Sequence, residues 1–156
     1  MKNRFSAAAL ATGVLVFASG GFAAAAEPRP PGPGDRCAVC GMFVEKYHPW
    51  VATIAFADGA QVFFDGPKDL FRYLLDPEKF KVKDRAISEV YVTDYYRVRL
   101  IDAKTAFFVV GSDVMGPMGG ELVPLEKRDD AETFALDHKG QEILEFDDMT
   151  LAKIPK

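Results

Sequence analysis

The stretch VATIAFADGAQVFF, residues 51–64, sets the first element of the fold. Two apolar, β-prone runs at 51–56 and 60–64 flank an Asp-Gly turn, which is typical of a β-hairpin. Residues 65–75 follow with a cap-type Asp65, an early Pro67 and apolar side chains at helical spacing, so we expect a helix. Asp76-Pro77 ends that helix, and residues 89–93 are predicted to form the next strand.

The same order of patterns recurs further along the chain. We predict strands at 106–110 and 121–125, a helix at 129–138 capped by Gly140, and a last strand at 142–146. The sequence therefore predicts an α+β fold of two β-β-α-β units, residues 37–94 and 95–150, with antiparallel strands and covering helices. The halves share a pattern but not residue identity, so a duplication is a hypothesis.

The first residues have the pattern of an export signal. Lys2 and Arg4 precede an apolar run at about 5–22 and the small residues 23–26, so residues 1–26 are predicted to be a cleaved signal peptide. A lipoprotein signal would place a cysteine directly after the small residues, whereas the first cysteine is Cys37. We therefore expect a soluble periplasmic protein.

Residues 27–36 are a Pro/Gly-rich leader that we expect to be flexible and partly extended, and residues 37–150 form the predicted domain. Losing Lys2 and Arg4 lowers the basic count from 19 to 17 against 23 acidic residues, a net charge of about −6. Such a charge argues against nucleic acid and anionic lipid as partners, because both are polyanions.

Cys37 and Cys40, the chain's two cysteines, lie in the sequence RCAVCGM, residues 36–42. If residues 40–42 are extended, Cys40 and Met42 point to the same side, and soft sulfur ligands of this kind select Cu(I). A disulfide is the default for two cysteines in an oxidising compartment. Structural zinc would need two further ligands from His48 and His138, which lack the spacing of zinc motifs.

A second sulfur-bearing stretch, GSDVMGPMGG, spans residues 111–120. Methionine usually fills gaps in a core, but the surrounding glycines leave little side-chain mass to bury it. Met115 and Met118 are therefore candidate metal ligands. His48 is either a further ligand or a surface residue, and His138, near a helix end, is expected to favour the helix dipole.

Three motifs together resemble the NosL family of nitrous oxide reductase accessory proteins: CGM at 40–42, FDGPKDLF at 64–71 and MGPMG at 115–119. The resemblance implies a periplasmic Cu(I) carrier that supplies the multicopper sulfide centre of nitrous oxide reductase and acts with a membrane copper/sulfur transporter complex. It also implies a fold related to organomercurial lyase. Carried over to this chain, the family's sulfur residues fall on Cys40, Met42, Met115 and Met118.

We therefore predict a Cu(I) chaperone, not an enzyme, for nitrous oxide reductase or a related periplasmic copper enzyme. Cys40 anchors the ion, Met115 or Met118 completes the site, and Cys37 or Met42 serves as an alternative ligand during exchange. The protein is expected to be a monomer or a weak homodimer. The alternatives are a thiol-disulfide oxidoreductase using Cys37 and Cys40, an organomercurial-lyase-like enzyme, and a structural domain with an oxidised cysteine pair.

Overall fold

The computed structural model describes residues 28–81 and 85–156, so the predicted signal peptide lies outside the described residues. The first sheet has the strand order β2-β1-β3-β4 and is antiparallel throughout. Its strands are β1 (Ala52–Phe56), β2 (Gln61–Phe64), β3 (Ile87–Asp94) and β4 (Arg99–Asp102). β1 and β2 confirm the predicted hairpin, and Gly59 occupies its turn with a φ of +83°.

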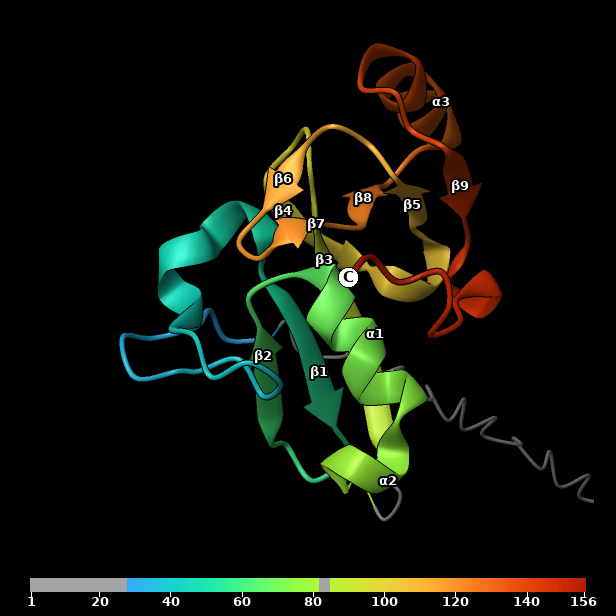
Figure 1. Cartoon of the computed structure of the whole chain (residues 1–156). Helices are drawn as coiled ribbons and strands as arrows, with labels where there is room; N and C mark the ends of the chain where they lie inside the picture. The colour runs from blue at the N-terminus through green and yellow to red at the C-terminus, as the bar shows by residue number, and fades with distance from the viewer. Residues whose placement is uncertain (1–27, 82–84) are drawn as a thin grey trace, which may run out of the picture.

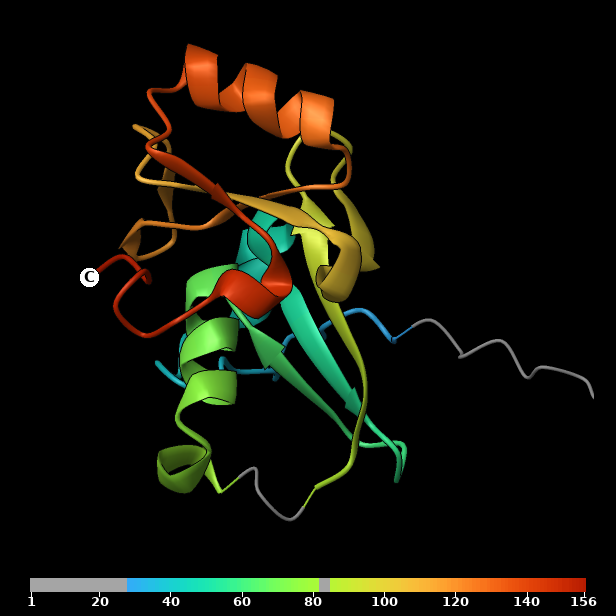
Figure 2. The same cartoon turned by 90° about the vertical axis from the view of Figure 1, so that its right-hand side faces the viewer.

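Two helices follow the hairpin. α1 (Pro67–Leu75) begins with the proline that the sequence places there, and α2 (Pro77–Phe80) begins after Asp76. α1 lies along the first sheet, where it buries Leu70 and Phe71 completely or nearly so (Figures 1 and 2). Asp76 ends α1, as predicted, but its side chain also accepts a hydrogen bond from the Lys79 amide and so starts α2.

The second sheet repeats the plan of the first. Its strand order is β8-β5-β9, from β5 (Phe107–Val110), β8 (Val123–Leu125) and β9 (Glu142–Leu144), and both pairings are antiparallel. α3 (Arg128–Asp137) packs on this sheet at the far end of the molecule from α2 (Figure 2). The α+β prediction with antiparallel sheets is confirmed. β1 lies between β2 and β3 in the first sheet, as β5 lies between β8 and β9 in the second.

Several elements were not predicted. β4 extends the first sheet, and the loop between β5 and β8 contains a small hairpin of β6 (Met115–Gly116) and β7 (Gly119–Gly120). Short 3-10 helices cover Val44–Trp50 (η1), Ala103–Thr105 (η2) and Phe146–Asp148 (η3). At the end of α3 the left-handed residue is Lys139 and not Gly140, although the Gly140 amide does bond back to the Ala135 carbonyl.

Residues of both sheets and of α1 share one core cluster, and a second, smaller cluster lies between the second sheet and α3. Phe71 of α1 contacts Phe108 of β5 edge to face, with ring centroids 5.0 Å apart. Buried Asp94, at the end of β3, accepts the Glu126 amide at 2.7 Å just after β8. A buried carboxylate that is hydrogen-bonded in this way fixes one sheet against the other.

Both ends of the described chain pack more closely than predicted. In the leader, Pro28 is buried, Arg29 pairs with Asp35 and its guanidinium lies 4.6 Å from the centre of the Phe63 ring. The leader is therefore held against the domain over residues 28–36. At the other end Ile154 belongs to the core, so the packed domain extends beyond residue 150.

Candidate metal centre

The cysteines lie in a tight loop that is attached to the first sheet. Arg36 and Phe43 pair across the base of the loop, and the Cys37 amide donates to the Met42 carbonyl at 2.8 Å. Gly41 makes the turn possible with a φ of +79°, a conformation that side chains other than glycine's rarely adopt. The backbone of Cys37 also forms a parallel β-bridge with Phe63 of β2. These contacts fix the direction in which both sulfur atoms point.

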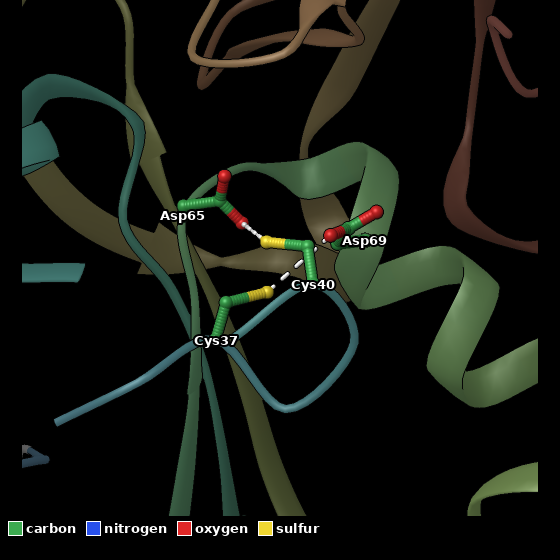
Figure 3. Close-up of side chains that lie close together, drawn as sticks. All are labelled: Cys37, Cys40, Asp65 and Asp69. Atoms are coloured by element: carbon green, nitrogen blue, oxygen red, sulfur yellow. Dashed lines mark hydrogen bonds between the residues drawn. The ribbon is translucent and has the colours of Figure 1, made fainter. Parts of the chain in front are cut away.

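The two thiols face two carboxylates at the start of α1 (Figure 3). Cys37 Sγ donates to Asp69 Oδ2 and Cys40 Sγ donates to Asp65 Oδ1, each at 3.3 Å. The ligand atoms of these four residues lie within 4.8 Å of one another, and both cysteines are free thiols. The cluster can hold a metal ion, and the cysteine pair is present as a dithiol instead of the default disulfide.

Burial makes both thiols weak acids. It raises the pKa of Cys40 to about 11. Burial also raises the pKa of Cys37, with a smaller contribution from Asp65, whose carboxylate lies beside this thiol too. Both thiols are therefore protonated at neutral pH. A metal ion binds cysteine as the thiolate, so it must displace these protons.

The sequence did not reveal that Asp65 and Asp69 belong to the site. Asp65 looked like a helix cap, but Gly66 occupies the cap position of α1 and the Asp65 carboxylate binds Cys40 instead. Asp69 is buried and also pairs with Arg72 Nη1 at 3.1 Å. Asp65 and Asp69 are four residues apart at the start of a predicted helix, and residues at this spacing lie on the same helix face. This spacing was the sequence signal that could have indicated a shared site.

The methionines lie on a separate element. Met115 and Met118 belong to the β6–β7 hairpin, where their side chains are 64% and 45% exposed. The hairpin lies beside the start of α1, and Lys68 Nζ donates to the Met118 carbonyl at 2.9 Å (Figure 1). Met42 is half-buried at the end of the cysteine loop, where its carbonyl accepts the Cys37 amide.

Neither histidine joins the cysteine–aspartate cluster. His48 is exposed in η1 and lines a shallow groove of about 240 Å³ with the leader prolines. His138 follows α3, where it stacks on Phe134 with ring centroids 4.4 Å apart and lies 3.3 Å from Asp113. This position at the helix end agrees with the structural role expected for it.

An α+β domain that brings two free thiols and two carboxylates together has the build of a metal-binding protein. Across residues 28–154 the sequence matches the NosL family. The chain is a member of that family.

Curated relatives carry the same family name. The copper-binding lipoprotein NosL of Stutzerimonas stutzeri is 29% identical over 126 residues, which are 76% of this chain and 63% of the relative. Its counterpart in Achromobacter cycloclastes is 33% identical over 120 residues, 69% of this chain and 60% of the relative. The matches thus span less than two thirds of either relative.

The fold agrees with a solved structure, that of the copper chaperone NosL from Shewanella denitrificans. It superposes with a TM-score of 0.68 and 28% identity, covering 81% of this chain and 97% of that one. These relatives are named as copper-binding proteins and a copper chaperone, and not as enzymes. Within the described residues, no helix combines the length and apolar character that crossing a bilayer requires.

Proposed function

We propose that this protein is a copper chaperone that carries Cu(I) as cargo on Cys37 and Cys40. The observation that carries the proposal is the convergence of two free thiols in a member of a family whose relatives are named for copper. Thiolate sulfur is soft and polarisable, as is Cu(I), whereas a site for a hard divalent ion would use oxygen ligands alone.

Asp65 and Asp69 support the thiols in this proposal. In the metal-free protein a carboxylate 3.3 Å from each sulfur accepts a hydrogen bond from the thiol and so fixes the orientation of the cysteine side chain. Groups that hydrogen-bond to metal ligands tune and orient them in many metalloproteins. Cys40 is the more accessible of the two cysteines and is the natural anchor for an arriving ion.

Met115 or Met118 completes the site, and Met42 or Cys37 serves as an alternative ligand during exchange. Exposed thioethers suit this role because they bind soft ions without losing a proton. A chaperone must also release its ion. A site with few ligands, some of them on an exposed hairpin, allows a partner's ligand to add before the chaperone's ligand leaves.

The client and the compartment are proposed from the family resemblance. We propose delivery to nitrous oxide reductase or another periplasmic copper enzyme, in contact with a membrane copper/sulfur transporter complex, by a protein that is a monomer or a weak homodimer. The predicted signal peptide supports a periplasmic location. The relatives are named lipoproteins, whereas this chain has no cysteine before Cys37. A relationship to organomercurial lyase remains a prediction from the family resemblance.

The oxidoreductase alternative fits the site less well. Disulfide-exchanging enzymes lower the pKa of the attacking thiol, commonly at a helix N-terminus, because the thiolate is the nucleophile. Burial here does the opposite and raises the pKa of Cys40 to about 11.

The test is a Cu(I) titration of the reduced protein against a competing chelator. We expect tight binding that weakens in Cys40→Ala and in the pair Met115→Ala/Met118→Ala. Leu136→Ala, which removes an 85% exposed apolar side chain on α3, is the matched control and should bind as the wild type does. Equal affinity in all four proteins would contradict the proposal.

A further inference from the structure

Two charged residues next to the metal cluster are buried without taking part in it. Lys68 is 2% exposed and Glu121 is 3% exposed. A buried charge is costly unless hydrogen bonds and an opposite charge compensate it, so both residues need partners. Lys68 Nζ finds them in two backbone carbonyls of the β6–β7 hairpin, Met118 at 2.9 Å and Gly120 at 2.8 Å.

Glu121 connects the hairpin back to the start of α1. Directly after β7, its Oε1 accepts the Lys68 amide at 2.6 Å and the Leu122 amide at 3.0 Å. The Lys68 amide is one of the free donors at the start of α1, and Gly66, at the cap position, has no side chain to satisfy it. Glu121 therefore caps α1 from 53 residues away.

Two glycines make room for this carboxylate. A Cβ on Gly66 would collide with the Glu121 carboxylate, and a Cβ on Gly116 would lie 2.8 Å from its Cγ. Gly66 has an extended φ of −164°, so space and not backbone conformation requires glycine there. The hairpin and the start of α1 are thus fitted around one side chain.

The first turn of α1 consequently serves both parts of the site. Asp65 and Asp69 face the thiols, and Lys68, between them in sequence, reaches the backbone of the methionine hairpin. Lys68 of α1 donates hydrogen bonds to the hairpin, and Glu121, directly after the hairpin, accepts a hydrogen bond from α1. These reciprocal hydrogen bonds connect the methionine motif to the cysteine motif through a single helical turn.

We propose that Lys68 and Glu121 are positioning residues that hold the methionine hairpin to the cysteine site, so that both motifs act on one copper ion. The inference rests on the function proposed above and extends it to residues that touch no metal. If it holds, the methionines contribute to Cu(I) affinity only while the hydrogen bonds of Lys68 and Glu121 between α1 and the hairpin are intact.

A thermodynamic cycle tests this dependence. Cu(I) affinity is measured with and without Met115→Ala/Met118→Ala in three backgrounds: wild type, Lys68→Leu, and Lys104→Leu as an exposed-lysine control. We expect the methionine substitutions to weaken binding about tenfold or more in the wild type and the control. In Lys68→Leu the same substitutions should change affinity less than about twofold, because the coupling has been removed.

The outcomes separate the two proposals. An equal methionine effect in all three backgrounds overturns the positioning role and leaves the chaperone function standing. A wild type that binds no Cu(I) fails the proposed function itself and the inference with it. A wild type that binds Cu(I) tightly but is indifferent to the methionines overturns the inference and the methionine part of the proposed site, and leaves Cu(I) carriage on the cysteines standing.

A second variant and a spectroscopic signal guard against a merely structural loss. Glu121→Gln keeps the shape of the side chain and an acceptor oxygen while removing the ionisable carboxyl group, whose pKa burial raises to about 7. In methionine-methyl NMR spectra, Cu(I) should shift the Met115 and Met118 signals of the wild type. In Lys68→Leu and Glu121→Gln those shifts should shrink while binding at Cys40 persists. A full methyl response in every folded variant would contradict the proposal.

Discussion

The cysteine loop and the methionine hairpin supply sulfur in opposite ways. The loop at 36–43 is bound to β2, and its thiols are wholly or partly buried against carboxylates. The β6–β7 hairpin consists of two-residue strands, exposes its thioethers and is tied to α1 by Lys68. Thiols need a fixed environment that controls their protons, whereas thioethers carry no proton and can stay at the surface. The difference separates an anchoring part from an accessible part.

The largest expected effect comes from removing an anchoring thiol. Cys40→Ser should lower Cu(I) affinity by more than about 100-fold, the upper range for losing a group that only supports a metal ligand. Met118→Ala should cost less, because Met115 remains on the same hairpin. Competition titrations of both variants measure the two losses in Cu(I) affinity. Similar losses in the two variants would remove the distinction between the two regions.

The next effect concerns the junction between them. Gly66→Ala places a Cβ against the Glu121 carboxylate and should lower the free energy of unfolding by about 1–3 kcal/mol, as overpacking does. Gly34→Ala is the control, since its Cβ would meet nothing within 4 Å. Urea denaturation gives both values. A neutral Gly66→Ala would show that the junction is loose.

Gly41→Ala tests the rigidity of the cysteine loop alone. No atom lies within 4 Å of the added Cβ, but the φ of +79° disfavours alanine. We expect a loss of about 1–2 kcal/mol in unfolding free energy. The same denaturation experiment measures it, and an unchanged midpoint would mean that the loop relaxes to another conformation at no cost.

The smallest effect is a pH dependence of the stability of the metal-free protein in alkaline solution. Folding raises the thiol pKa values, that of Cys40 to about 11, so the folded state holds its thiol protons more tightly than the unfolded state does. This stability is complete below the ordinary thiol pKa and declines as the pH rises above about 9, where the unfolded thiols ionise.

Denaturation at pH 7 and pH 9.5 should therefore reveal a loss of stability at the higher pH. The Cys37→Ser/Cys40→Ser variant is the reference for all other titrating groups, and it should lose less. An identical loss in both proteins would show that the thiols are not buried as described.

The elements could be predicted from sequence where the pattern is local. The Asp-Gly turn gave the hairpin, and Pro67 with its apolar spacing gave α1. Strand β4, with Arg99 and Asp102 at its ends, lacks the apolar alternation that would have revealed it. The leader's prolines exclude a helix but say nothing about packing, and Arg29 holds it down through a cation–π contact.

Only the sulfur-containing residues of the site could be predicted from the sequence. The cysteine and methionine motifs are visible along the chain, but the partners of the thiols depend on how the start of α1 packs against the loop. Asp65 was predicted to cap the helix because that is its usual local role. Glu121, in the segment between β7 and β8, caps the helix instead, and no pattern of neighbouring residues reveals a cap from so far along the chain.

The hydrogen bonds of Arg72 bear on how the protein should be produced. Its guanidinium binds Asp69 of the cluster through Nη1 and the Pro155 carbonyl through Nη2 at 2.9 Å. Residues fused after Lys156 would therefore start close to the thiols. An affinity tag of histidines at that end would bring competing imidazole ligands to the copper, so purification handles belong at the other end of the domain, with a cleavable linker.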